Sequence, residues 1–392
     1  MRILFLSGWY PEPPNNGSKL RILNLLRGLA QHHEVTLLSF SDDAQVDVST
    51  SELRTLCPQI EIVPANQFIA AGWRARLGFF SLTPRSVLAT RSAEMEKRLA
   101  QLLANGRYDL IIASQLGPAG YSDCFQGVPA LLEEVEVALL RERYTQATAL
   151  QDKARHGLTW AKQKRYLKRL LADFRACTVV SEQEKALVAE VSPAYRDVTV
   201  IPNCINLAEY KAVAVKPEPN RLIFTGSFRY HANHEAMTWF LGEVFPLILA
   251  KAPDVQLTIT GDHANLPLPS LKNVTLTGFV DDVRTLIASS WLSLSPLLVG
   301  GGTRLKILEA MALHTPVVAT SKGAEGLDAR PGEHLLIADT PQAYAEAVLL
   351  LWRDPALRQR LADNAYQFVA EQYDCAVTIP RFLALVERVA DV

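Results

Sequence analysis

The sequence lacks the signatures of several large protein classes. It has no uninterrupted apolar run near the roughly 18 residues that a transmembrane helix needs, so we expect no membrane span. It has no Gly-x-Gly-x-x-Gly, the phosphate-binding fingerprint of nicotinamide dehydrogenases, which disfavours that class. Its 40 basic and 41 acidic residues give a net charge of −1, which does not indicate a general nucleic-acid binder, and we expect no nucleic-acid partner.

Metal-binding and disulfide patterns are also missing. No Asp-x-Asp occurs, and no cluster of His, Cys and Asp has the spacing of metal ligands. The apolar run Met1–Ser7 is too short for a signal peptide, so we expect a cytoplasmic protein. We also expect free, mostly buried thiols, with neither a disulfide framework nor a zinc site. The cysteines are odd in number and show no Cys-x-x-Cys spacing: Cys57, Cys124, Cys177, Cys204 and Cys375.

The spacing of apolar residues predicts an α/β protein with two domains. A chain of 392 residues exceeds what one hydrophobic core usually serves, and two domains of roughly 200 residues are the natural division. A strand–loop–helix–strand pattern opens the chain at residues 2–40 and starts again at Arg221, as expected for parallel sheets. A final helix, residues 355–392, has a break near Tyr373. Further strands are predicted at residues 60–63, 110–113, 130–133, 177–180, 255–260, 274–277, 292–295 and 317–320.

A glycine loop that leads into a helix, residues 296–312, is the most informative stretch of the chain. Three consecutive glycines allow the backbone to approach a ligand closely, and the free N–H groups of the first helical turn point at it. Arg304 and Lys306 place two cations there, where the helix dipole disfavours them unless an anion is bound. The pattern predicts a phosphate or diphosphate site. The alternative is a tight turn before a core helix on which Lys306 and Glu309 form a surface pair.

The same segment resembles the signature of a known family. GGGTRLKILEAMALHTPVVAT, residues 300–320, is similar to the C-terminal signature of glycosyltransferase family 4, and its triple glycine resembles the subgroup that makes bacterial exopolysaccharides and other surface glycans. The usual signature has two glutamates separated by seven residues. Glu309 matches the second glutamate, whereas Gly301 replaces the first and His314 replaces a glycine.

This resemblance implies the GT-B fold, in which two Rossmann-like domains face each other across a cleft. We expect an N-terminal acceptor domain at residues 1–205, a C-terminal nucleotide-sugar donor domain at 206–370, and a helix at 371–392 that crosses back to the first domain. The implied activity is that of a retaining hexosyltransferase, which moves a sugar from a nucleotide diphosphate sugar to a glycan or lipid-linked acceptor. No cofactor is expected, and the missing Asp-x-Asp indicates independence of metal.

The resemblance also gives roles to residues of the second domain. Lys306 and Arg304 are the candidate catalytic residues, because charge grows on the leaving diphosphate as the glycosidic bond breaks. Glu309 would accept hydrogen bonds from the ribose hydroxyls, and its alternative is a surface glutamate. For Arg229 the alternative is a solvated loop arginine, and for Phe279 a core residue. The candidate donor contacts are Gly17, Ser227, Arg229, Phe279, Gly301, Gly302, Thr303 and Glu309.

The first domain carries a weaker signal. The family often places a histidine near the donor sugar after the strand that follows Asp109, but this chain has Gln115 there. Gln115 is therefore predicted as a polar sugar contact, and a histidine base is absent from that position. Glu133, Glu134 and Glu136 follow the next strand, and we choose Glu134 as the one that orients the acceptor hydroxyl. A structural or solvated role is the alternative for each.

Two stretches combine basic residues with apolar ones. Residues 68–80 combine aromatic side chains with Arg74 and Arg76 as their only charges, and residues 153–175 hold eight basic residues against Asp173 alone. Basic amphipathic segments can lie on anionic membrane, so we expect a peripheral contact with the inner face of the cell membrane. The alternative is a solvated basic helix face.

Two other functions stay open for the chain as a whole. One is a nucleotide-sugar epimerase of the same fold, which would need acid and base groups that Gly301 and Gln115 make scarcer. The other is a non-catalytic nucleotide-sugar-binding module. The presence of Lys306 together with Glu309 argues against such a module.

Overall fold

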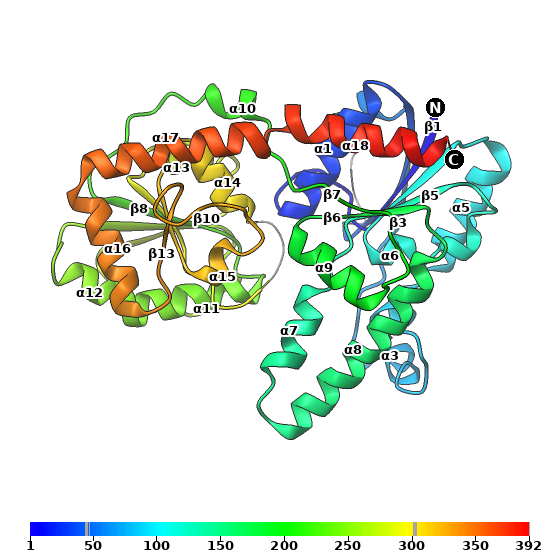
Figure 1. The fold of residues 1–392 in the computed structure, drawn as a ribbon, viewed down its shortest axis with the longest axis horizontal. Helices are drawn as coiled ribbons and strands as arrows, with labels where there is room; N and C mark the ends of the chain where they lie inside the picture. The colour runs from blue at the N-terminus through cyan, green and yellow to red at the C-terminus, as the bar shows by residue number, and fades with distance from the viewer. Residues whose placement is uncertain (44–45, 47, 301–303, 392) are drawn as a thin grey trace. The chain divides into compact units, whose positions relative to one another are not determined.

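The computed structural model describes residues 1–43, 46, 48–300 and 304–391, which form two compact units. Unit 1 comprises Met1–Pro202 and Ile379–Val392, and unit 2 comprises Asn203–Thr378. Figure 1 shows each unit as a sheet with helices packed against it. Both sheets are parallel throughout, which confirms the predicted α/β class with two Rossmann-like domains.

The sheet of unit 1 has the strand order β3-β2-β1-β4-β5-β6-β7. Its central strands are runs of buried Leu, Ile and Ala, as expected for a parallel sheet covered on both faces. One hydrophobic cluster includes Leu4 and Leu132, and another includes Phe5 and Leu131, so neighbouring residues of one strand face opposite layers. The strands are β1 (Arg2–Ser7), β2 (Glu34–Ser41), β3 (Gln59–Pro64), β4 (Leu110–Ser114), β5 (Ala130–Glu133), β6 (Ala176–Val179) and β7 (Val198–Val200).

The helices of unit 1 include a hairpin, α7 and α8, that projects from the sheet in Figure 1. Polar side chains cap several of these helices, and Asn16, Ser92 and Ser181 each accept a hydrogen bond from a backbone N–H of the first turn. The helices are α1 (Gly17–Ala30), α2 (Leu53–Leu56), α3 (Trp73–Leu77), α4 (Arg85–Thr90), α5 (Ala93–Asn105), α6 (Leu116–Ala119), α7 (Ala138–Gln146), α8 (Leu150–Leu171), α9 (Glu182–Val191) and the later part of α18 (Cys375–Ala390).

The sheet of unit 2 has the order β10-β9-β8-β11-β12-β13. Helix α14, the predicted signature helix, packs one face on α17 through Ile307, Met311 and Phe368. The strands are β8 (Arg221–Thr225), β9 (Gln256–Thr260), β10 (Val274–Gly278), β11 (Leu292–Ser295), β12 (Val317–Ala319) and β13 (Leu336–Ile337). The helices are α10 (Leu207–Lys211), α11 (His231–Trp239), α12 (Phe245–Leu249), α13 (Arg284–Ala288), α14 (Leu305–Ala312), α15 (Ser321–Ala324), α16 (Pro341–Arg353) and α17 (Pro355–Gln372).

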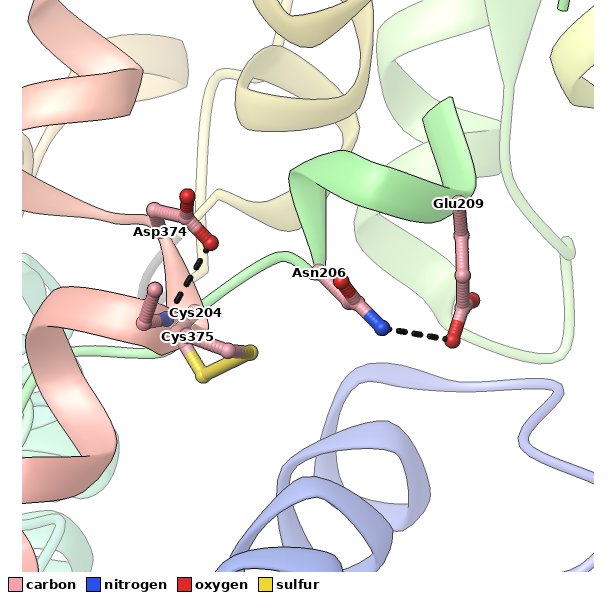
Figure 2. Close-up of a disulfide and its surroundings, with 6 residues drawn as sticks. Cys204, Asn206, Glu209, Asp374 and Cys375 are labelled. Atoms are coloured by element: carbon pink, nitrogen blue, oxygen red, sulfur yellow. Dashed lines mark hydrogen bonds between the residues drawn. A yellow bond between two sulfur atoms is a disulfide. The ribbon is translucent and has the colours of Figure 1, made fainter. Parts of the chain in front are cut away.

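Cys204 and Cys375 form a disulfide, so the expectation that all five thiols are free was wrong (Figure 2). The pairing could not be foreseen from spacing, because 171 positions separate the two residues. An isolated parallel bridge between Ile205 and Asp374 brings the two segments together and places the cysteine Cα atoms 5.0 Å apart. The other three cysteines, Cys57, Cys124 and Cys177, are free.

The predicted break in the last helix is confirmed. Helix α17 ends at Gln372 and α18 begins at Cys375. Along the described part of the chain, no helix combines the length and the apolar character needed to cross a bilayer.

Candidate functional site

Each sheet has a switch point, where the strand order reverses beside the first strand. In unit 1 it lies between β1 and β4, and in unit 2 between β8 and β11. Open α/β sheets bind ligands at the carboxyl ends of these strands. The residues that follow β8 and β11 form one candidate site, and those that follow β1, β4 and β5 form a second.

Lys306 reaches across the switch point of unit 2. It lies in the first turn of α14, and its Nζ donates a 2.8 Å hydrogen bond to Oδ1 of Asn233 on α11. The same Nζ lies 4.2 Å from the ring centre of Phe224 on β8. A Cβ atom added at Gly226 would come within 3.1 Å of it, so the ammonium lies against backbone that directly follows β8.

The protonation of Lys306 is sensitive to its surroundings. The side chain is half-buried, and burial lowers its pKa to about 7, with nearby Arg304 acting in the same direction and Glu309 opposing. A bound anion would favour the charged form. The arrangement therefore suits a diphosphate, whose negative charge would stabilise the charged ammonium.

Asn233 links Lys306 to the tightly packed turn that follows β8. Its Nδ2 donates a 2.8 Å hydrogen bond to the carbonyl of Ser227, so one amide links the β8 turn to the lysine. Gly226 has a φ of 150°, and a Cβ atom at Gly261 would lie 2.6 Å from the Gly226 carbonyl carbon. Only glycines allow these two backbones to approach so closely.

Arg304 faces away from open space. It is the N-cap residue of α14 and is 5% exposed. Its Nη2 donates to the carbonyls of Gly300, at 2.8 Å, and Lys322, at 3.0 Å. Arg304 thus braces the end of the glycine loop. Three further predicted donor contacts, Gly301, Gly302 and Thr303, lie outside the described residues.

Glu309 lies one turn further along α14 and is bound by a tyrosine. Tyr210 Oη donates a 3.0 Å hydrogen bond to Glu309 Oε1. Burial raises the pKa of Glu309, while the bond from Tyr210 and the charge of Lys306 lower it. Because Lys306 bonds to Asn233 and Glu309 to Tyr210, the two residues do not form the simple surface pair that was the alternative interpretation.

The remaining predicted donor contacts of unit 2 lie on exposed loops. Arg229 is 77% exposed on its side chain and donates Nε to the carboxylate of Asp262, while its backbone N–H donates to Ser227 Oγ. Phe279 follows Gly278, which has a φ of 74°, and is 60% exposed. Phe279 is therefore not a core residue, and its ring is available to lie against a planar ligand.

In unit 1, Trp9, Gln115 and Glu134 form a chain of hydrogen bonds at the switch point. Trp9 Nε1 donates to Gln115 Oε1 at 3.0 Å, and Gln115 Nε2 donates to Glu134 Oε2 at 2.8 Å. Since indole only donates and a carboxylate only accepts, the orientation of the amide is fixed. Gln115 and Glu134 have φ values of 72° and 58°, which are strained for residues other than glycine. The structure thus brings the two predicted sugar contacts together.

The adjacent Glu133 has a structural role instead. Its Oε1 accepts a 2.6 Å bond from Arg21 in a fully buried ion pair, and its Oε2 accepts from Ser114 Oγ at 2.7 Å. Arg21 lies near the start of α1, and this ion pair holds its side chain inside the protein. Gly17 is the first residue of α1, whose N-cap Asn16 accepts a bond from the backbone of Lys19.

Glu134 is the titratable group of this second cluster. Burial raises its pKa to about 7, and the charge of Glu133 acts in the same direction. Arg21 and the hydrogen bond from Gln115 act against this rise. The carboxyl group can therefore hold or release a proton near neutral pH, which is the range in which a group that orients or deprotonates a hydroxyl is useful.

Sequence reasoning missed Asn233, Tyr210 and Trp9. Asn233 and Tyr210 lie 73 and 99 positions from the acidic or basic residue that each contacts, so local spacing carries no signal for them. Trp9 had one available signal, since it comes two residues after the end of β1, where ligand-binding loops begin.

Two family models match the chain. The model described as Glycosyltransferase Family 4 matches residues 15–209, and the model described as Glycosyl transferases group 1 matches residues 219–354. Together they cover most of the chain, with one model on each sheet. These matches favour the transferase over the epimerase and binding-module alternatives.

Curated relatives and solved structures agree with this assignment. A 44.6 kDa protein of the cps region of Klebsiella pneumoniae is 22% identical over 95% of this chain and 96% of its own length. A phosphatidyl-myo-inositol mannosyltransferase of Mycobacterium leprae is 30% identical over 50% of this chain and 54% of its own. Sucrose-phosphate synthase of Thermosynechococcus elongatus superposes with a TM-score of 0.71 at 18% identity and 99% coverage of both chains. Anabaena HepE in complex with UDP and glucose gives 0.68 at 14% identity, again with 99% of both chains. These structures establish the GT-B fold.

Proposed function

The chain belongs to glycosyltransferase family 4, and from this premise we propose that it is a retaining transferase that moves a hexose from a nucleotide diphosphate sugar to a glycan or lipid-linked acceptor. Unit 2 would bind the donor and unit 1 the acceptor. The observation that carries the proposal is the position of Lys306, whose ammonium joins the ends of β8 and β11 at the switch point.

The reaction requires stabilisation of the leaving group. As the bond from the sugar to the diphosphate breaks, its electron pair stays on the phosphate oxygen, and Lys306 is placed to hold the added negative charge. The acceptor hydroxyl attacks from the same face, and its proton passes to the departing phosphate. The configuration at the sugar is thereby retained without a covalent intermediate on the protein, and no metal is needed for this charge stabilisation.

The other donor contacts fix the nucleotide. Glu309 would accept a hydrogen bond from a ribose hydroxyl through Oε2, since Tyr210 donates to Oε1. The exposed ring of Phe279 would lie against the base. Ser227, Arg229, Gly301, Gly302 and Thr303 would surround the phosphates. Gly17, at the start of α1, would be the donor contact of unit 1. Arg304 would support this loop through its bonds to Gly300 and Lys322.

Gln115 and Glu134 would bind sugar hydroxyls on the side of the acceptor. The fixed amide of Gln115 and the carboxylate of Glu134 offer a donor and an acceptor within one cluster, which matches the two capacities of a hydroxyl group. We further propose that the enzyme works in the cytoplasm at the inner face of the cell membrane, where a lipid-linked acceptor would be presented.

Donor screening tests the function directly. The protein is incubated with UDP-, GDP- and ADP-hexoses and an acceptor extract, and release of the nucleoside diphosphate is measured together with transfer of labelled sugar. UDP-glucose is the first donor to try, because UDP and glucose occupy the related HepE structure. Transfer that Lys306→Ala abolishes supports the proposal. An altered nucleotide sugar with no release of diphosphate indicates the epimerase, and binding without turnover indicates the binding module.

A further inference from the structure

An exposed apolar segment lies outside both candidate sites. It comprises residues 68–82, which include α3, and we call it the aromatic segment. Soluble monomers rarely expose so many large apolar side chains close together unless the surface contacts a partner. Phe80 alone is 93% exposed. The exposed large apolar side chains of the segment are Phe68, Ile69, Trp73, Leu77, Phe79, Phe80 and Leu82.

The aromatic segment is held in place by two cations. Arg85 donates hydrogen bonds to the carbonyls of Ala70, at 2.8 Å, and Ala75, at 2.7 Å, and its guanidinium lies 3.8 Å from the ring centre of Phe79. Lys162 on α8 donates to the carbonyls of Gly78 and Phe79 at 3.1 and 3.0 Å. The polar backbone is thus bound from the protein side, while the apolar side chains point outward.

The helix that holds this segment is strongly basic. Lys162 belongs to α8, which carries seven basic residues and a single acidic one, Asp152. Arg165 and Lys168 are exposed, and so are the apolar side chains of Leu150 and Leu158 in the first half of the helix. Figure 1 shows α3 beside α8 in the projecting part of unit 1. Residues 62–93 contain no Asp or Glu, so no acid neutralises this surface from the segment itself.

We propose that the aromatic segment and the basic face of α8 form a docking surface for a bilayer that contains anionic lipid. Aromatic and aliphatic side chains enter the boundary between headgroups and acyl chains, and neighbouring Lys and Arg side chains bind the anionic headgroups. Ile69, Leu77 and Leu82 favour lipid over nucleic acid, because aliphatic side chains offer no stacking surface for bases. The inference deepens the proposed function and rests on it in one respect, since a lipid-linked acceptor lies in such a bilayer.

The test is sedimentation with vesicles of phosphatidylcholine, with and without phosphatidylglycerol. Wild-type protein is expected to bind only the vesicles with phosphatidylglycerol, and to be released at high salt. Arg165→Gln with Lys168→Gln should weaken binding by roughly 25-fold, at about fivefold per charge. Phe80→Ser with Leu82→Ser should weaken it by at least about tenfold. All four side chains are exposed, so these variants are expected to fold.

Matched controls come from other surfaces. Leu350→Ser changes an exposed leucine of α16, and Lys97→Gln an exposed lysine of α5, and neither should alter vesicle binding. Trp73 supplies a second readout: its emission should shift to shorter wavelength on anionic vesicles, and Trp73→Phe should remove that shift. Absence of vesicle binding at low salt overturns the proposal, as does binding that both double variants leave unchanged. Preferred binding of single-stranded nucleic acid, or self-association through the segment, would also overturn it.

Donor binding separates this inference from the proposed function. Thermal stabilisation by UDP is measured without vesicles for the wild type and both double variants. Equal stabilisation with lost vesicle binding supports a docking role for the surface. If UDP stabilises the wild type but the wild type never binds vesicles, the proposed transferase function stands and only the proposed docking surface is overturned.

Discussion

Cys204 and Cys375 are joined by a disulfide that links the first and last segments of unit 2. The bond accompanies a backbone connection, because Ile205 N–H donates to the Tyr373 carbonyl and Cys375 N–H donates to the Ile205 carbonyl, both at 2.9 Å. In Figure 2 the start of α10 leaves from the same point, with Asn206 Nδ2 bonded to Glu209. The disulfide therefore closes nearly the whole of unit 2 into one covalent loop.

Removing this disulfide should lower the stability of unit 2. A cross-link over a long loop restricts the unfolded chain, and typical losses on its removal are about 2–4 kcal/mol. We expect Cys204→Ser, or reduction of the wild type, to decrease the free energy of unfolding by that amount in urea titrations. Cys124→Ser, which alters a free and half-buried thiol, is the control. A transition that reductant leaves unchanged would argue that the bond does not form in solution.

The fold could be predicted well from the sequence, because its central strands are apolar runs separated by helix-forming segments. The short strands β7 and β13 escaped prediction, since three and two residues give no readable alternation. The break between α17 and α18 was predicted at Tyr373 and is present. The disulfide was not, because Cys204 and Cys375 meet only through the bridge between Ile205 and Asp374.

The candidate site could be predicted only in part. Lys306 and Glu309 could be chosen as candidates because glycines, helix and charges occur together within ten residues of the chain. Their partners Asn233 and Tyr210 come from other elements and depend on how the sheet is wound. Arg304 has the charge and the sequence position expected of a phosphate ligand, yet its guanidinium donates hydrogen bonds to backbone carbonyls. The spacing of residues in the sequence does not predict these partners.

Transfer should not depend on a divalent metal. The proposed mechanism gives the diphosphate charge to Lys306 and to backbone N–H groups, so a chelator in excess should leave the rate within about twofold of that with magnesium. The measurement is initial rate with each additive on dialysed enzyme. Loss of most activity in chelator, with recovery on adding magnesium or manganese, would refute metal independence.

The pH dependence of the acceptor site should follow Glu134. Burial raises its pKa to about 7, so the carboxylate that accepts a hydrogen bond from the acceptor hydroxyl forms as the pH rises through about 7. We expect kcat/KM for the acceptor to rise over that range and Glu134→Gln to remove the rise. Gln115→Ala should raise the acceptor KM more than it lowers kcat, since it removes a binding contact present before reaction.

A stability measurement provides an independent check on Glu134. A carboxyl group whose pKa is raised in the folded state binds its proton more tightly there than in the unfolded chain. The resulting stabilisation is present below the unfolded pKa and is lost as the pH rises through about 7. Glu134→Gln mimics the protonated form, so its Tm should match the wild type at about pH 4 and exceed it at about pH 8. Parallel Tm curves would place the pKa of Glu134 at its ordinary value.

Glu309 should act on donor binding and not on the chemical step. Ribose hydroxyls keep their charge during transfer, so Glu309→Gln is expected to raise the donor KM about tenfold or more, in line with the loss of a hydrogen bond to a charged group, with little change in kcat. Tyr210→Phe removes the 3.0 Å bond to Glu309 and should produce a smaller rise in KM. A fall in kcat alone for Glu309→Gln would show that this carboxylate contributes to the transition state.

Lys306 should act on the chemical step as well as on donor binding, because the charge it holds on the diphosphate increases as the glycosidic bond breaks. We expect Lys306→Ala to lower kcat by on the order of 100-fold, the scale for removing one preorganised charge-stabilising group. Asn233→Ala removes the 2.8 Å bond that positions the ammonium and should cause a smaller loss of kcat. Near-normal kcat in Lys306→Ala would transfer the role to Arg229 or Arg304.

A pH titration of donor binding distinguishes charge from packing at Lys306. Burial lowers its pKa to about 7 in the free protein. Above that pH the side chain is a neutral amine, which must gain a proton when the diphosphate binds. Affinity for a nucleotide sugar should therefore weaken with rising pH, by up to about tenfold per unit above about 7. A nucleotide sugar is the proper probe, because the terminal phosphate of a free nucleoside diphosphate itself titrates near pH 6. Lys306→Met keeps most of the side-chain volume without the charge, and its affinity should be weak and flat across the same range. If the wild type is equally flat, the ammonium of Lys306 stays charged in the free enzyme and the lowered pKa has no part in donor binding.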